Sequence, residues 1–268
     1  MSPKKISKFI STSIKSLNQK RRKPEIIAVL CVHNEQLNID TCLYHLEPYV
    51  EKIVILDDGS TDDTIKIAKQ HKKVIKVISS TTRTKWDERK NRETVLKEAF
   101  NVSKKQNAWA LCIDADERFE EKFLQNIKKI TKKYSGKNLA INIHFRELWD
   151  TPYQYRVDGI WNTKRKDLLL PLSKKMTFCY PQEHHFPWHY SELNNREVLL
   201  DYNLYHLKMI KKSDRKKRAI LYNQLDPHKR MQPIGYDYLT DTTNMQLIKI
   251  PQSKKYNYKT IPKYYLSD

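Results

Sequence analysis

Two clusters of carboxylates carry the chemistry that this sequence suggests. The segment Asp57–Asp62 reads DDGSTD and directly follows a short apolar run. The triplet Asp114-Ala115-Asp116 follows another apolar run in the same way. Two carboxylates separated by one residue can both reach one hard divalent cation, and oxygen ligands suit Mg²⁺ or Mn²⁺. Because such a cation can neutralise a diphosphate, the clusters predict a nucleotide site.

Each cluster also has a simpler interpretation. Gly59 permits a sharp turn, and residues 60–62 can cap a following helix. The adjacent aspartates Asp57 and Asp58 are more than a cap requires, which favours a ligand. An acid-x-acid triplet is common on solvated loops, but here it follows a buried strand, which again favours a binding site.

The elements that must position these clusters alternate along the first 115 residues. Short apolar runs, typical of strands buried on both faces of a parallel sheet, occupy residues 26–32, 53–56, 74–78 and 109–113. Helix-like stretches lie between them, at about 38–47, 62–70 and 88–104. This order predicts an α/β fold with a doubly wound, Rossmann-like, mostly parallel sheet. Ligands bind beyond the carboxyl ends of such strands, where both acidic clusters lie.

The second half of the chain is less regular. The elements predicted there are a helix at about 120–133, a strand at 139–145 and a late helix between Ser213 and Pro227. Ser213 and Asp214 form the expected N-cap of that helix. Residues 146–200 are rich in Trp, Tyr, His and Pro and follow no simple period. Such sequence over a regular scaffold is typical of a substrate pocket, although irregular cores share it.

The order of these segments resembles that of family 2 glycosyltransferases, which have the GT-A fold. The first strand ends in VHNE (32–35), and the segments DDGSTD (57–62) and DADE (114–117) follow in the family's order. The resemblance covers residues 25–130. It implies a metal-dependent, typically inverting enzyme that moves a sugar from a nucleoside-diphosphate sugar, with UDP as the expected nucleotide. A saccharide or glycolipid acceptor is expected, as in the assembly of surface polysaccharide or lipopolysaccharide.

The resemblance also implies roles for individual residues. Those expected to bind the nucleotide are His33, Asn34 and Glu35 near the base or ribose, Asp57 or Asp58 on the uracil or ribose, and Asp114 on the ribose or the metal shell. Asp116 would bind the diphosphate and the Mn²⁺ or Mg²⁺ ion.

His206 resembles the late histidine that GT-A enzymes often recruit to the metal or the diphosphate. The alternative is a histidine hydrogen-bonded within a core strand. Lys208, Lys211 and Arg215 follow it and could screen a leaving diphosphate, or could face solvent.

Two further parts of the site are harder to assign. Arg83 and Arg89 lie where related enzymes contact the nucleotide, but the sequence lacks the Gly-rich loop and Asn that are common there. A solvated, basic helix start is the alternative. For the carboxylate base that deprotonates the acceptor hydroxyl, Glu183 is the first candidate and Asp158 the second. Either could also be an ordinary ion-pair partner.

Length and composition favour one domain. No Gly/Ser-rich linker divides the 268 residues, and 39% of them are hydrophobic, which excludes a disordered chain. We expect a GT-A domain over 25–250, with a nucleotide-sugar-binding half at 25–130 and an acceptor-side half at 131–250. Residues 1–24 form a basic extension, and residues 251–268 a C-terminal tail.

The net charge of +20 attracts nucleotides, anionic lipid and nucleic acid alike. Eight Lys and Arg and no acid lie in residues 1–24, and apolar positions recur at helical spacing over 4–20. A helix of this kind could lie on an anionic membrane, or could dock on the domain or stay disordered. The four cysteines form no CxxC pair, and no segment could span a bilayer. We therefore expect a cytoplasmic protein that could bind the inner face of the membrane peripherally.

Two other functions fit parts of the sequence. A nucleotidylyltransferase would share the fold class, but normally has a Gly-rich loop after the first strand, which is absent here. A nucleic-acid-binding protein is suggested by the charge and by the Tyr/Lys-rich tail at 254–265. Because no nucleic-acid-binding motif accompanies that tail, tyrosines packed on the domain are the favoured interpretation.

Overall fold

The computed structural model describes residues 23–79, 87–178, 188–193, 196–230 and 232–267. The basic segment at 4–20, Arg83 and Glu183 lie outside these ranges, so the predictions made for them stay predictions. No helix among the described residues is both long and apolar enough to cross a bilayer.

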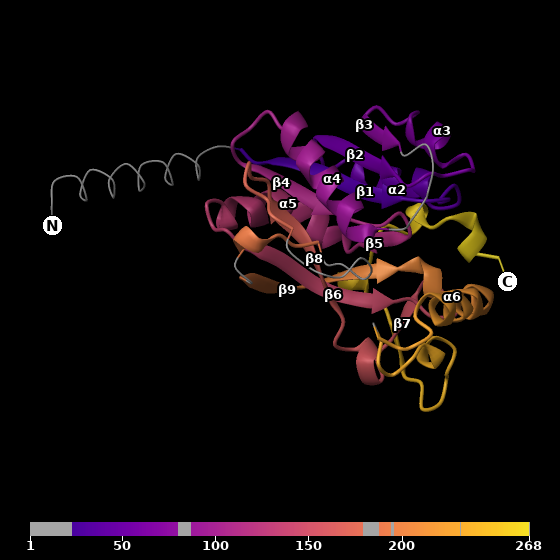
Figure 1. Ribbon diagram of the computed structural model, residues 1–268. Helices are drawn as coiled ribbons and strands as arrows, with labels where there is room; N and C mark the ends of the chain where they lie inside the picture. Colours follow the sequence, from indigo (N-terminus) through magenta and orange to yellow (C-terminus); the bar gives the residue numbers. More distant parts are fainter. Residues whose placement is uncertain (1–22, 80–86, 179–187, 194–195, 231, 268) are drawn as a thin grey trace, which may run out of the picture.

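A mixed sheet of eight strands runs through the molecule in the order β3-β2-β1-β4-β8-β6-β9-β5 (Figure 1). The strands are β1 (Glu25–Val32), β2 (Lys52–Asp57), β3 (Val74–Ser79), β4 (Ala108–Cys112), β5 (Glu117–Phe119), β6 (Ala140–Glu147), β8 (Arg165–Pro171) and β9 (Glu197–His206). Strand β1 pairs in parallel with β2 and with β4, β2 pairs in parallel with β3, and β6 pairs in parallel with β9. Strands β8 and β5 run antiparallel to their neighbours. The α/β fold with a mostly parallel sheet is therefore confirmed.

Five α-helices were expected in the described ranges, at about 38–47, 62–70, 88–104, 120–133 and 213–227, and the structure has all five. They are α2 (Ile39–Leu46), α3 (Thr64–Ala68), α4 (Glu88–Val102), α5 (Glu121–Tyr134) and α6 (Lys212–Leu225).

The helices lie on both faces of the sheet because side chains of β1 alternate between two cores. Ile26, Ala28 and Leu30 pack in one cluster with apolar residues of α2, α3 and α5. Ile27 and Val29 pack in a second cluster with apolar residues of α4. The carboxyl ends of β1 and β4 border a cleft that α6 also lines.

Two local expectations were wrong. Strand β3 was expected to be buried on both faces, but it is the edge strand of the sheet, and Ile75 is 46% exposed. Helix α6 begins after Lys211, with no side-chain cap, rather than at a Ser213-Asp214 cap. Asp214 lies in the first turn of the helix, and its carboxylate accepts a hydrogen bond from the hydroxyl of Tyr264.

The remaining short elements surround the second half of the sheet. They are the paired strands β7 (Gln154–Arg156) and β10 (Leu247–Lys249), and the 3₁₀ turns Gly159–Trp161, Ser191–Leu193, Leu207–Met209, Asp237–Leu239, Gln252–Lys254, Tyr258–Thr260 and Lys263–Tyr265.

The C-terminal segment after β10 is packed against the domain. Tyr256 and Tyr265 are buried in a cluster with Leu148, Tyr205 and Leu207. Their rings are therefore inside the protein and cannot stack on the bases of a nucleic acid.

Arg118 fastens this segment to the rest of the chain. Its fully buried guanidinium donates to the carbonyls of Ala115 and Thr260, at 2.9 and 3.0 Å, and to the hydroxyl of Thr41 at 2.7 Å. One side chain thus ties α2, the DADE segment and the C-terminal segment together.

Replacing Arg118 with Met should lower the free energy of unfolding by about 3 kcal/mol or more, because several buried acceptors lose their donor at once. Urea unfolding followed by circular dichroism measures this change. Lys132→Met, at an exposed position of α5, is the control and should change stability by less than about 0.5 kcal/mol. An Arg118→Met variant as stable as the control would contradict this account of the C-terminal segment.

Candidate functional site

A cleft of about 710 Å³ lies beyond the carboxyl ends of β1 and β4 and is closed on its far side by α6. Its lining is rich in ionisable groups of both signs. The acids are Glu35, Asp58, Glu88, Asp114, Asp116 and Asp214, and the basic residues are His33, Arg92, His206, Lys208, Lys217 and Arg218. Both acidic clusters of the sequence contribute to this one cleft, through Asp58 in the first and Asp114 and Asp116 in the second.

Asn34 and Asp57 hold the loops beside the cleft and do not line it. Asn34 adopts a left-handed backbone with φ of 54°, which asparagine tolerates better than most residues. Its side chain accepts from the backbone N–H of Thr61 at 2.8 Å, and its own N–H donates to Ser60 Oγ at 3.0 Å. Asp57 Oδ1 accepts from the N–H of Ser60 at 2.9 Å. These two residues therefore fit the turn interpretation, and the geometry argues against direct nucleotide contacts for them.

His33, Glu35 and Asp58 lie at the cleft. The Nδ1 atom of His33 is 3.0 Å from the carbonyl oxygen of Asp58, which joins the ends of β1 and β2. Glu35 accepts from Asn38 at 2.7 Å and pairs with Lys208 at 2.8 Å. Burial raises the pKa of Glu35, although Lys208 opposes this effect.

The DADE turn is held by a lysine from the neighbouring strand. Lys166 of β8 reaches Asp114 Oδ2 at 2.6 Å and Glu117 Oε1 at 2.5 Å, while the other oxygen of Glu117 accepts from the N–H of Asp114 at 2.9 Å. Burial disfavours ionisation of Asp114, but Lys166 and Arg92 hold its pKa below the ordinary value. Nothing in the sequence pattern around Lys166 marks this role, because it depends on β8 lying beside β4.

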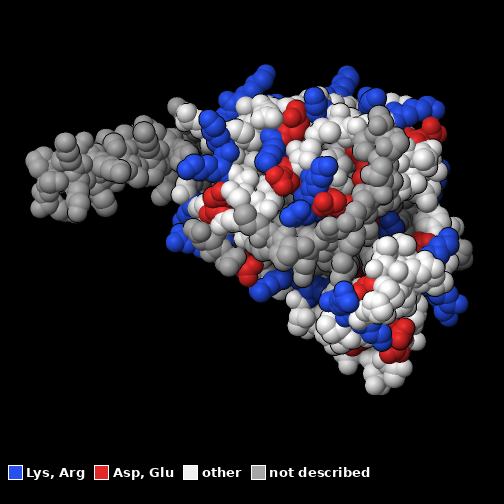
Figure 2. Space-filling view, viewed as in Figure 1, with Lys and Arg blue, Asp and Glu red and all other residues white. Residues whose placement is uncertain are grey.

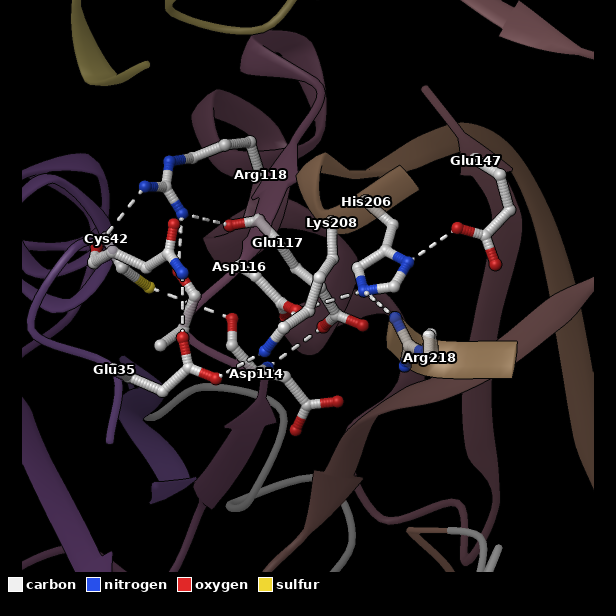
Figure 3. A network of polar contacts seen from close by, with 12 residues as sticks. Glu35, Cys42, Asp114, Asp116, Glu117, Arg118, Glu147, His206, Lys208 and Arg218 are labelled. Carbon is white, nitrogen blue, oxygen red and sulfur yellow. Dashed lines mark hydrogen bonds and ion pairs between the residues drawn. The ribbon is translucent and has the colours of Figure 1, made fainter. Parts of the chain in front are cut away.

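Asp116, His206 and Glu147 form a chain of buried contacts (Figure 3). His206 Nε2 is 3.1 Å from Asp116 Oδ2, and its Nδ1 is 2.5 Å from Glu147 Oε2. Burial alone would lower the pKa of His206, but the carboxylates of Glu147 and Asp116 raise it to about 9. Burial also disfavours ionisation of Asp116, yet His206 and Lys208 hold its pKa well below the ordinary value. Asp116 and His206, the two residues that the sequence analysis expected at the metal or diphosphate, thus face each other at the cleft.

Two cations complete this part of the cleft. Lys208 Nζ lies 3.6 Å from Asp116 Oδ2, and Arg218 Nη1 lies 3.4 Å from His206 Nε2. Of the basic residues that the sequence suggested after His206, only Lys208 lines the cleft. Arg215 is buried and pairs with Asp150 at 2.7 Å, while Lys211 donates to the carbonyl of Ser267. Arg218 lines the cleft instead of Lys211 and Arg215, because it lies one helical turn after Asp214 on the face of α6 that meets the cleft. The sequence analysis did not identify Arg218.

The Asp116–His206 pair could supply two ligands to a divalent cation, provided that the cation displaces the proton that the raised pKa of His206 retains, because only neutral imidazole binds a metal. Adjacent ligands of an octahedral cation with bonds near 2.1 Å lie about 3 Å apart, which the carboxylate and imidazole atoms of this pair match. Glu147 fixes the ring from behind, as carboxylates commonly do for metal-binding histidines. Within the described ranges, no group of three or more His, Cys, Asp or Glu side chains is arranged to hold a metal. Other ligands would have to come from phosphate oxygens and water.

The remaining predicted residues lie elsewhere. Asp158 is bonded to the guanidinium of Arg156 through both oxygens, at 2.8 Å each, and is not part of the cleft lining. Arg156 holds the pKa of Asp158 below its ordinary value. Asp158 is thus an ion-pair partner near β7, and the geometry argues against it as the base. Arg89 lies on α4 but does not line the cleft, whereas Arg92, one turn further on, does.

Replacing Lys166 with Met should leave Asp114 and Glu117 side by side without their shared cation and cost about 3 kcal/mol of stability near neutral pH. The burial of Glu117 already raises its pKa to about 7, above the ordinary value. A carboxyl group whose pKa is higher in the folded than in the unfolded state stabilises the fold while it is protonated, and this stabilisation is lost as the pH rises through the folded pKa. The free energy of unfolding of the variant should therefore fall as the pH rises from about 5 to 8. Urea unfolding at several pH values, with Lys132→Met as the control, measures both effects. Equal stability of the two variants at pH 8 would contradict the charge-pairing role of Lys166.

No curated protein matches the sequence. Among solved structures, a mycobacterial protein shares 18% identity over 46% of this chain and 41% of its own, with a TM-score of 0.32. Glucosyl-3-phosphoglycerate synthase from Mycobacterium tuberculosis, in complex with Mn²⁺, UDP and glucosyl-3-phosphoglycerate, shares 17% identity over 51% of this chain and 48% of its own, with a TM-score of 0.31. The chain thus spans less than half of the length of these solved proteins.

The family comparison covers more of the chain. The family described as "Glycosyl transferase family 2" matches residues 27–202, which is more than half of the sequence and includes both acidic clusters. The mostly parallel α/β sheet is of the GT-A type that this family has. The chain therefore belongs to glycosyl transferase family 2.

Proposed function

We propose that the protein transfers a sugar from a nucleoside-diphosphate sugar, with UDP as the nucleotide, to a saccharide or glycolipid acceptor in the assembly of a surface glycan. The observation that carries this proposal is the convergence of Asp58, Asp114, Asp116 and His206 on one cleft beyond the strand ends. Family membership supports glycosyl transfer, while the donor, the acceptor and the pathway are part of the proposal.

The cleft offers groups suited to both parts of the donor. His33, Glu35 and Asp58, from the loops after β1 and β2, are polar groups suited to a base and ribose. Lys208, which pairs with Glu35, and Arg218 of α6 would stabilise the negative charge of a departing diphosphate. Asp114 lines the same cleft, and we assign it to the ribose.

We assign the metal site to Asp116 and His206. A bound Mn²⁺ or Mg²⁺ would neutralise the diphosphate as a Lewis acid. In this proposal Asp116 supplies an anionic oxygen, and Glu147 keeps the imidazole ring turned so that Nε2 faces Asp116. Glu183 stays the proposed base for an inverting reaction, in which it would take the proton of the acceptor hydroxyl.

The two other functions considered gain no support. A nucleic-acid-binding role would use the tail tyrosines, but Tyr256 and Tyr265 are buried. A nucleotidylyltransferase would need a Gly-rich loop after β1, where the chain has Val32, His33, Asn34 and Glu35.

Removing the carboxylate of Asp116 should abolish binding of the cation and diphosphate. For wild type, UDP with Mn²⁺ should raise the melting temperature more than UDP alone, because only the folded state binds the complex. Asp116→Asn should lose this extra rise and the Mn²⁺-dependent hydrolysis of UDP-sugars. Asp63→Asn, at an exposed position outside the cleft, is the control. Hydrolysis that survives both a chelator and Asp116→Asn would reject the metal role.

Changing Glu147 should weaken Mn²⁺ binding without removing a metal ligand. Loss of a carboxylate behind a metal-binding histidine typically costs about 10- to 100-fold in affinity. We expect Glu147→Gln, which keeps a hydrogen-bond acceptor, at the lower end of this range and Glu147→Leu at the upper end. Electron paramagnetic resonance of free Mn²⁺ in the presence of UDP measures the affinity. Glu93→Gln, on the surface of α4, should bind as wild type. Unchanged affinity in Glu147→Leu would show that His206 needs no such support, or binds no metal.

A further inference from the structure

The exposed side of α6 has a regular pattern of side chains that reaches the cleft but has no part in the proposed cleft chemistry. Two rows of side chains with a spacing of four residues run along the helix, and each row passes from lysine to aliphatic residues. The rows are Lys212, Lys216 and Ile220, and Lys217, Leu221 and Leu225. All six side chains are exposed. Residues three and four apart are neighbours on a helix surface, so Lys217 lies beside Ile220 and the two rows form one strip.

The aliphatic end of this strip is unusually open to solvent. Ile220 is 60% exposed, Leu221 48% and Leu225 44%. Three large aliphatic residues within six positions of one helix form a surface that a partner can bury. In Figure 2 the surface over α6 shows uncharged side chains, with Lys and Arg at their border.

The strip also adjoins the cleft. Lys217, Leu221 and Leu225 belong to the cleft lining, whereas Lys216 and Ile220 do not. Whatever covers the strip therefore lies at the mouth of the cleft, on the side opposite the ends of β1 and β4.

We propose that α6 lies on the surface of an anionic lipid bilayer. The charge pattern carries the choice of partner, since Lys212, Lys216 and Lys217 are exposed along one end of a strip whose other end is aliphatic. On a bilayer, aliphatic residues enter the boundary between headgroups and acyl chains, while lysines extend to the phosphates. This contact would bring the cleft mouth to the membrane. We infer a lipid-linked acceptor from this placement, an inference that rests on the proposed glycosyl transfer, whereas the membrane contact itself does not.

The test compares variants of the full chain in flotation with vesicles of phosphatidylglycerol and phosphatidylcholine. Each lysine near an anionic surface contributes about fivefold to partitioning, so Lys216→Gln should bind about fivefold more weakly. Lys132→Gln, at an exposed position of α5, should bind as wild type. Ile220→Asp should weaken binding more than Lys216→Gln does. Its matched control is Leu199→Asp on β9, where the leucine is 44% exposed.

Three results would overturn the proposal. In the first, Lys216→Gln and Ile220→Asp partition onto the vesicles as wild type does. In the second, wild type binds vesicles of phosphatidylcholine alone as well as it binds the anionic vesicles. In the third, light scattering shows a wild-type dimer that Ile220→Asp dissociates. The first would leave any membrane binding to other parts of the chain, and the third would assign the strip to a second copy. Lys216 and Ile220 lie outside the cleft, so both variants should keep the UDP-dependent rise in melting temperature. Failure of that rise in wild type would instead count against the proposed function.

Discussion

A carboxylate at the end of a buried strand stays ionised only if cations or hydrogen-bond donors reach it, and Asp116 meets this condition through residues far away in the sequence. His206 comes from the end of β9 and Lys208 from the turn that follows it. Glu147, from the end of β6, holds the other side of the imidazole ring. The parallel pairing of β6 with β9, which puts Glu147 opposite His206 in register, is thus what makes the charge arrangement possible.

The same requirement gives the two aspartates of each acidic cluster different partners. The carboxylate of Asp57 accepts a hydrogen bond from the N–H of Ser60 within its own turn, whereas Asp58 lines the cleft. In the second cluster, Asp114 takes a lysine from β8, and Asp116 takes the histidine. Adjacent acids with the same side chain therefore have different roles because their partners come from different elements.

The sequence predicted the first half of the fold well, since apolar runs and intervening helices are local patterns. It also pointed to Asp116, through the acid-x-acid pattern and the family resemblance, and to His206, through the resemblance alone. The structure brings these two side chains to 3.1 Å of each other. Lys166, Glu147 and Arg218 could not be found in this way. Each is an ordinary charged residue in its local context, and its importance comes from strand order in the sheet or from the face of α6 that meets the cleft. Asp158 illustrates the converse, because its neighbour Arg156 binds both of its oxygens.

Arg118 also has a consequence for how the protein is made. Its guanidinium bonds to Ala115, within the DADE turn, and to Thr260, which lies 142 residues after it. On the ribosome, the strands that carry the acids emerge long before Thr260 does, so the turn lacks one of its fixed contacts through most of synthesis. The hydrogen bond between Arg118 and Thr260 can therefore form only after the strands that carry the acids have been synthesised.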